Sequence, residues 1–253
     1  MTKKNQEKND SALMSSIESG IIEQEEADRD KESNLHSDSS PMSYVLKREF
    51  NRIPHTKIPS SGKRLVVACA STGGPNAFQK IIPVLPANLN APVILVQHMA
   101  KGFTGSLAKR LGEKSFIEVK EAAAGEKLKN GCVYVAKAGE HITVEHHRGG
   151  LYISFSDIPA RSGLKPCADI LFESLMDKDV DEFICVVLTG MGSDGTRGIG
   201  HLSEKKNVYC IAQDEETSTV YGMPGMVVKA GLADEVLPLE SIADAIIRVT
   251  GTK

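Results

Sequence analysis

From residue 63 onwards, short runs of Val, Ile and Leu alternate with segments whose apolar residues recur every three or four positions. The short runs are nearly continuous, which is typical of strands buried on both faces. They predict strands at residues 63–70, 92–97, 116–122, 182–188, 207–212 and 235–237. The helical spacing predicts helices at residues 76–85, 104–114, 168–177, 196–205, 225–230 and 239–249. Strands that alternate with helices predict an α/β fold, a doubly wound and mainly parallel sheet with helices on both faces.

Three short alternating runs interrupt this pattern in the middle of the chain. They span residues 132–137, 141–146 and 151–156, and glycine-containing pairs separate them. Short alternating strands joined by tight turns are typical of antiparallel hairpins. We therefore expect a small antiparallel hairpin or meander appended to the sheet.

The first 60 residues have a different composition from the rest. Residues 11–43 are rich in Ser and acidic side chains and carry few large apolar residues. Such a segment cannot bury enough surface to offset the entropy lost on ordering, so residues 1–60 are predicted to be a disordered tail and linker. Within it, Leu13, Ile17 and Ile21 share one face of a short helix, and docking of this helix on a partner is the alternative to a transient helix. The folded domain is expected at residues 61–253.

Composition narrows the class of protein. The chain has 253 residues, 41% of them hydrophobic, and a net charge of −3. No apolar run is long enough to span a membrane, the start is not signal-like, and no basic cluster is interleaved with aromatics. Nucleic-acid binding and direct membrane insertion are therefore not expected. The cysteines lack metal-type spacing and are expected to be reduced, which favours the cytoplasm; they are Cys69, Cys132, Cys167, Cys185 and Cys210.

Three reactive side chains lie just past predicted strands. Ser71 follows the first strand, His98 the second, and Asp194 the strand at 182–188. Ligands of open parallel sheets bind outside the carboxyl ends of the strands, so these residues are expected to converge. A hydroxyl, an imidazole and a carboxylate are the parts of a nucleophilic hydrolase. Gly73 and Gly74 permit a tight turn and close approach of a substrate to the backbone.

Each of these residues also has a simpler interpretation. Ser71 is placed to cap a helix, His98 to pack in the core, and Asp194 to cap a helix in its glycine-rich turn. Residues 190–195 also form a literal G-x-G-x-x-G, which predicts nucleotide binding as a third kind of function. However, Asp194 would place a carboxylate beside the bound pyrophosphate at a helix N-terminus.

The histidines near residue 145 raise the question of a metal site. His146 and His147 are adjacent on a predicted strand and so face opposite sides, which prevents them from sharing an ion. We therefore expect His141, His146 and His147 to be surface residues of the hairpin and expect no metal.

Several segments closely resemble, in order, the catalytic domain of the protein-glutamate methylesterase of bacterial chemotaxis, the CheB type. The resemblance extends from about residue 63 to residue 249. It is carried by VACASTGGP at 67–75, VQHM at 96–99, GFT at 102–104, ADILFES at 168–174, LTGMGSDG at 188–195, IAQDE at 211–215 and YGMP at 221–224.

This resemblance implies hydrolysis of methyl esters on glutamate side chains of chemoreceptors, and often deamidation of receptor glutamines, without a metal or organic cofactor. It implies that Ser71 is the nucleophile, His98 the general base and then acid, and Asp194 the group that orients the imidazole. Thr72, Gly73 and the amide of Met191 are then expected to border the substrate and the developing oxyanion.

Two departures from the family pattern affect these expectations. Family members usually carry an N-terminal phospho-acceptor receiver domain, for which the segment before residue 63 is too short and too polar. Residues 165–169 read KPCAD where the family form is Arg-Pro-Ser-Val-Asp. This change is expected at the rim of the cleft, away from the triad. A non-catalytic receptor-binding module of the same fold is the alternative function, and the complete set of Ser71, His98 and Asp194 speaks against it.

Overall fold

The computed structural model of the chain describes residues 50–147 and 149–252. The predicted acidic tail and the stripe of Leu13, Ile17 and Ile21 lie outside the described residues. The division into a tail and a domain near residue 60 therefore stays a prediction.

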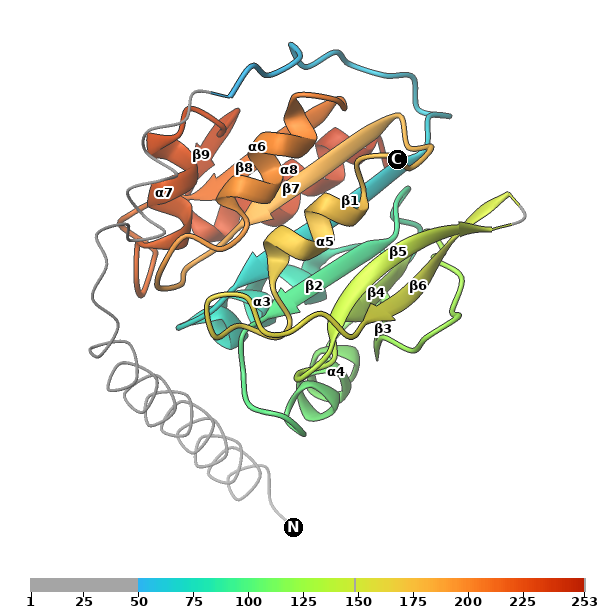
Figure 1. Ribbon diagram of the computed structural model, residues 1–253, viewed down its shortest axis with the longest axis vertical. Helices are drawn as coiled ribbons and strands as arrows, with labels where there is room; N and C mark the ends of the chain where they lie inside the picture. Colours follow the sequence, from blue (N-terminus) through green and yellow to red (C-terminus); the bar gives the residue numbers. More distant parts are fainter. Residues whose placement is uncertain (1–49, 148, 253) are drawn as a thin grey trace. The chain divides into compact units, whose positions relative to one another are not determined.

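A seven-stranded parallel sheet forms the centre of the fold (Figure 1). Its strands are β1 (Arg64–Ala70), β2 (Val93–Gln97), β3 (Glu118–Glu121), β4 (Cys132–Val135), β7 (Glu182–Val187), β8 (Val208–Gln213) and β9 (Glu235–Leu237). Their order across the sheet is β3-β4-β2-β1-β7-β8-β9. Strands β2, β3 and β4 lie on one side of β1, and β7, β8 and β9 lie on the other, so the sheet has its topological switch point beside β1. Open α/β sheets bind their ligands at this point.

Helices cover both faces of this sheet, which confirms the doubly wound architecture. One face is covered by α3 (Gly74–Ile81), α4 (Thr104–Gly112) and α8 (Leu239–Thr250). The other face is covered by α5 (Ala168–Ser174), α6 (Thr196–Ser203), α7 (Met223–Lys229) and a two-stranded hairpin. Alternate residues of β1 point into the two layers, and Leu65, Val67 and Cys69 pack on the side of α5 and α6. This alternation decides which face the next odd-numbered residue, Ser71, occupies.

The hairpin prediction is half right. β5 (His141–His147) and β6 (Gly150–Ser156) form an antiparallel pair outside the main sheet. The run at 132–137, expected to join them, is instead β4, a buried parallel strand between β2 and β3. A parallel crossover usually contains a helix, and no helical segment lies between β3 and β4. The connection at residues 122–131 crosses instead by bonding to β6, through the amides of Gly125 and Leu128.

The helix expected at 76–85 is shorter in the structure. It is α3 followed by η1, a 3-10 turn over Ile82–Val84 that contains Pro83. Proline has no N–H with which to continue the α-helical ladder, so regular helix ends just before it.

Residues 50–63 form an ordered strap, which we call the N-terminal strap. It runs past the amino ends of β1, β7 and β8, at the edge of the sheet opposite to the carboxyl ends of the strands (Figure 1). The sequence predicts a linker here, and the strap indeed contains no helix or strand. It is nevertheless attached along its length: the Ile53 amide donates to Ser203 O at 2.8 Å, and Thr56 and Asn207 exchange two hydrogen bonds.

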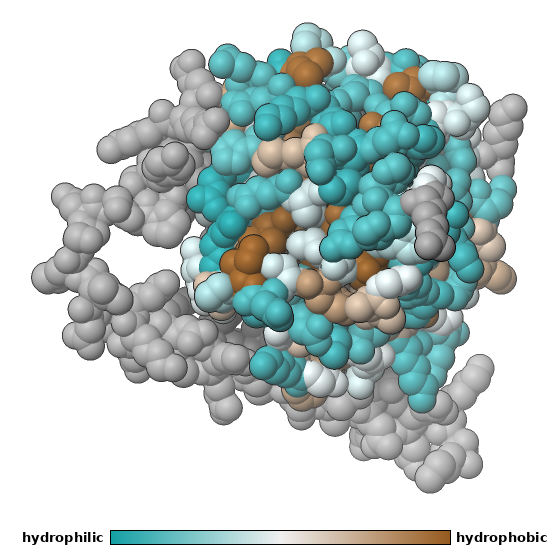
Figure 2. Space-filling view, turned by 45° about the vertical axis from the view of Figure 1, so that its right-hand side comes forward, coloured by the Kyte–Doolittle hydropathy of each residue, from teal (hydrophilic) through white to brown (hydrophobic). Residues whose placement is uncertain are grey.

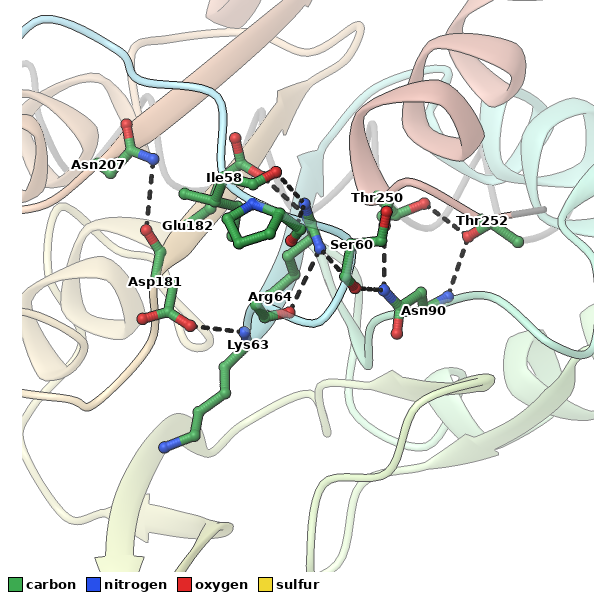
Figure 3. A network of polar contacts seen from close by, with 12 residues as sticks. Ile58, Ser60, Lys63, Arg64, Asn90, Asp181, Glu182, Asn207, Thr250 and Thr252 are labelled. Carbon is green, nitrogen blue, oxygen red and sulfur yellow. Dashed lines mark hydrogen bonds and ion pairs between the residues drawn. The ribbon is translucent and has the colours of Figure 1, made fainter.

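One buried ion pair anchors the strap (Figure 3). Arg64 Nε donates to Glu182 Oε2 at 2.9 Å, and both side chains are only 3% exposed. The remaining guanidinium N–H groups donate to carbonyls of the strap, including those of Ile58 and Pro59. His55 lies 2.6 Å from the second oxygen of Glu182. The buried carboxylate therefore connects the strap to the first residues of β1 and β7.

Among the residues that the structure describes, the hydrophobic patches seen in Figure 2 are small and interrupted by hydrophilic side chains. The large apolar side chains that are exposed come from separate elements and loops. Among the described residues, no helix has the length and apolar character needed to cross a membrane.

Replacement of Glu182 by Ala should destabilise the domain strongly, because it leaves the Arg64 guanidinium buried without a counter-charge. We expect the free energy of unfolding to fall by about 3–5 kcal/mol, measured by denaturant titration. The control is Glu240→Ala, which removes the Lys80 pair at a site where both side chains are about 60% exposed. That change should cost less than about 1 kcal/mol. Equal losses in the two variants would show that the strap is not held by its buried pair.

Candidate active site

The carboxyl ends of β2, β1 and β7 bring the three candidate side chains together. The last rung between β1 and β2 pairs Ala70 with Gln97, so Ser71 and His98 occupy the next opposing positions. The backbone holds this alignment beyond the strands: the His98 amide donates to Ala70 O and the Ser71 amide to Thr189 O, both at 3.1 Å. Ser71 is 4% exposed and His98 8%. The convergence expected from the sequence is present.

The imidazole of His98 is hydrogen-bonded to Asp194. His98 Nε2 lies 2.7 Å from Asp194 Oδ2, and both side chains are more than nine-tenths buried. An ionised carboxylate can only accept, so Nε2 carries the proton and donates it. The other ring nitrogen, Nδ1, is therefore the one not used by the aspartate. Ser71 is connected to His98 through the aligned backbone described above.

The N-terminus of α5 fixes the position of Asp194. The amide of Ala168 donates to Oδ2 at 2.7 Å, and the amide of Asp169 donates to Oδ1 at 3.0 Å. Burial acts to raise the pKa of Asp194, but the hydrogen bonds from His98 and from these two amides outweigh it and lower the pKa to about 2. Asp194 is therefore an anion at neutral pH.

A second buried aspartate holds the loop that carries Asp194. Asp169 Oδ1 accepts from the amides of Gly195 and Gly198, at 3.0 and 2.7 Å, in the first turn of α6. Asp194, which precedes α6, thus binds the N-terminus of α5, and Asp169, which lies in α5, binds the N-terminus of α6. Burial, and then the negative charge of Asp194, raise the pKa of Asp169 to about 7.

Cys167 contacts the triad, which corrects the expectation that residues 165–169 lie only at the rim of the cleft. Its Sγ donates to Asp194 Oδ1 at 3.0 Å, and the side chain is 2% exposed. Burial, followed by the charge of Asp194, raises the pKa of this thiol, so it stays protonated and keeps its S–H donor. A thiol therefore occupies the donor position where the family form has a serine.

The turn after β1 leaves the Ser71 hydroxyl free of a capping role. The N-cap of α3 is Gly73, with φ of 82°, and no side chain caps the helix. A Cβ at Gly73 would collide with the side chain of Thr219, so both the conformation and the space require glycine. The Gly74 amide donates to Ser71 O at 2.8 Å and closes the turn.

The loop after β7 packs directly against Ser71. A Cβ on Gly190 would lie 2.9 Å from the Cβ of Ser71, so only glycine permits this approach. Met191 follows it with a side chain that is 43% exposed, and Thr72 follows Ser71. The backbone of Gly190 therefore lies against Ser71, with Met191 next to Gly190 and Thr72 next to Ser71 in the chain.

The same loop argues against a bound pyrophosphate. The amides of Gly195 and Gly198, which a G-x-G-x-x-G loop would offer to phosphate, donate to the carboxylate of Asp169. The carboxylate of Asp194 lies beside them in the same loop. The carboxyl group of Asp169 thus occupies the anion-binding end of α6, and a second buried carboxylate lies next to it.

The histidines of the hairpin do not gather. His141 is fully buried, which corrects its prediction as a surface residue, and its Nε2 lies 3.2 Å from Pro159 O. His146 and His147 are exposed as expected, and His147 pairs with Glu145.

Sequence reasoning missed the residues that support the three side chains. The sequence pattern singles out neither Asp169, which lies within the motif at 168–174, nor Gln97, which precedes His98. Gln97 is fully buried at the end of β2, and its Nε2 donates to Ser71 O and His98 O, at 2.9 and 2.8 Å. A polar residue at the end of an otherwise apolar, two-sided buried strand was the available signal.

Fold and site together define a doubly wound α/β protein with a serine, a histidine and an aspartate assembled at its topological switch point. The family model described as CheB methylesterase matches residues 66–246, and the chain belongs to this family.

The chain is similar to relatives over about three quarters of its length. The Bacillus subtilis (strain 168) protein named protein-glutamate methylesterase/protein-glutamine glutaminase is 48% identical over 188 residues, which are 74% of this chain and 53% of that protein. The Geobacillus kaustophilus protein of the same name is 45% identical over 199 residues, 78% of this chain and 57% of the relative. The chain therefore spans little more than half the length of these relatives.

A solved structure covers the same region. The catalytic domain of Thermotoga maritima CheB methylesterase is 40% identical, with a TM-score of 0.71 over 75% of this chain and 99% of that domain. This similarity confirms the fold predicted from the pattern of strands and helices.

Replacement of Asp169 by Asn should change how stability depends on pH. Because the folded-state pKa of Asp169 lies above its unfolded value, folding favours the protonated form. Its contribution to stability is complete below pH about 4 and is lost as the pH rises through about 7. Asn keeps the oxygen that accepts from Gly195 and Gly198 but has no proton to lose. Relative to wild type, the variant should therefore gain stability from pH 4 to 7. Parallel unfolding curves across this range would contradict the prediction.

Proposed function

We propose that this protein is a serine hydrolase that removes methyl esters from glutamate side chains of chemoreceptors and also deamidates receptor glutamines. The observation that carries the proposal is the buried hydrogen bond between His98 and ionised Asp194, beside Ser71, in a chain of the CheB methylesterase family. The relatives' names, which join a methylesterase to a glutaminase, support both reactions.

The arrangement suits acyl transfer by Ser71. Its Oγ attacks the ester carbonyl while His98 Nδ1 takes the hydroxyl proton, since Nε2–H is already donated to Asp194. Asp194 stabilises the imidazolium that forms. The tetrahedral intermediate collapses as His98 returns the proton to the departing methanol, leaving an acyl-enzyme. Water activated by His98 then releases the free glutamate, and with a glutamine substrate the first leaving group is ammonia.

The developing oxyanion needs donors close to Ser71. The backbone of Thr72, Gly73 and Met191 supplies the candidates, because Gly73 and Gly190 keep that backbone free of side-chain bulk around the nucleophile. Met191 is also exposed enough to contact a protein substrate.

The alternative is a non-catalytic receptor-binding module. The position of Asp194 favours the enzyme: an ionised carboxylate is kept almost fully buried and aimed at an imidazole, a costly arrangement that binding alone does not need. The protein partners implied are methyl-accepting chemoreceptors. Reduced, buried cysteines are in keeping with a cytoplasmic enzyme.

Replacement of Ser71 by Ala tests the nucleophile. Methanol release from methylated receptor should fall by at least about 10⁴-fold, because no other group forms the acyl-enzyme. The free energy of unfolding should change by no more than about 1.5 kcal/mol, the scale of a single lost hydrogen bond. A folded variant with full activity would exclude Ser71 as the nucleophile.

The three side chains are expected to act as one unit. The double variant Ser71→Ala with His98→Ala should release methanol about as slowly as either single variant, since each loss removes the same step. The three variants are compared in single-turnover assays. If the two losses multiply instead, the groups contribute to separate steps.

A further inference from the structure

Gln97 joins the two residues whose side chains would react. Its carboxamide is fully buried at the end of β2. One nitrogen, Nε2, donates to the backbone carbonyl of Ser71 at 2.9 Å and to that of His98 at 2.8 Å. A primary amide nitrogen has two N–H donors, and here both are used, one on each residue.

The orientation of this amide is fixed by what surrounds it. If the group were turned over, its oxygen would face two carbonyl oxygens, which repel it, so the nitrogen must face them. Oε1 then lies where a Cβ on Gly74 would be, and it has no hydrogen-bond partner among the described residues. A buried acceptor left unpaired is unfavourable. The two hydrogen bonds made by Nε2 therefore come with the free-energy cost of an unpaired buried oxygen.

The amide acts where the regular sheet ends. The ladder between β1 and β2 stops at Ala70 and Gln97, and one further bond joins the His98 amide to Ala70 O. Beyond it the two backbones separate, because Ser71 leads into α3 while His98 leads into a loop. The Gln97 side chain is the next connection between them.

We propose that Gln97 is a positioning residue that sets the distance between the Ser71 hydroxyl and the His98 imidazole. This inference rests on the proposed serine-hydrolase mechanism. Gln97 is fully buried and its amide donates to backbone carbonyls, so it is expected to act on the chemical step and not on binding. Misplacement of reacting groups by about 1 Å can lower a rate about 10²-fold.

The chain contains a matched control. Gln213 is also a fully buried glutamine at the end of a strand, β8, and its amide also bridges loops: Oε1 accepts from the Thr189 amide at 2.8 Å, and Nε2 donates to Thr217 O at 2.7 Å. Its amide is hydrogen-bonded to Thr189 and Thr217 and not to Ser71 or His98. Gln97→Met and Gln213→Met therefore remove comparable buried amides and differ in what those amides connect.

The test uses the full chain and a glutamate γ-methyl ester peptide, with Ser71→Ala as the inactive reference. We expect Gln97→Met to lower kcat about 10²-fold with KM within about twofold of wild type, and to slow labelling of Ser71 by a fluorophosphonate to a similar degree. Gln213→Met should lose a much smaller factor in kcat for a similar change in melting temperature. Equal kcat losses in the two variants, or an unchanged kcat in Gln97→Met, would overturn the inference.

A second variant covers the case in which Gln97→Met does not fold. Gln97→Glu has one O–H donor when protonated and none when ionised, and burial against two carbonyls raises the pKa of such a carboxyl. Its activity should therefore fall as pH rises through that ionisation, a descending limb that wild type lacks. A profile of wild-type shape would count against Gln97 as a positioning residue. If wild type itself releases no methanol, the proposed function fails; if wild type is active and both Gln97 variants match it, only this inference fails.

Discussion

The site depends on an exchange of hydrogen bonds between two aspartates and two helix N-termini. Asp194, in the loop before α6, accepts hydrogen bonds from the first amides of α5. Asp169, in α5, accepts hydrogen bonds from amides at the start of α6. Helix N-termini carry unsatisfied N–H groups that burial would otherwise make unfavourable. Neither loop can move without breaking bonds made by the other. The carboxylate that faces His98 is thus held by its surroundings before any substrate binds.

The two halves of the site are fixed by different means. Ser71 and His98 take their positions from the register of β1 and β2, and from the bonds that continue it beyond the last rung. Asp194 lies several residues past β7, too far for strand register to place it, and depends on α5 instead. Adjacent strand ends place Ser71 and His98 close together, whereas the N-terminus of a helix stabilises the negative charge of Asp194. The constellation combines these two properties.

The pattern of apolar runs was sufficient to predict the parallel sheet, its helices and the strand ends where Ser71, His98 and Asp194 lie. The same pattern did not place β4 in the parallel sheet. The connection from β3 to β4 contains no helix and so leaves no periodic signal in the sequence. This connection is held by hydrogen bonds to β6, which lies further along the chain. Cys167 was placed at the rim because its contact with Asp194 joins segments that only the folded chain brings together. Side chains such as Gln97 and Asp169 act through backbone groups, whose positions a sequence does not display.

The N-terminal strap lies before the residues that match the family model but packs against a residue within them. The match to the family model begins at residue 66, yet Arg64 and the strap before it complete the environment of Glu182, a residue well inside that match. A fragment cut at the start of that match would contain Ser71, His98 and Asp194 and still lack Arg64, the partner of a buried charge at the opposite edge of the sheet. The start of the family match is therefore not the start of the segment that supplies the counter-charge of Glu182.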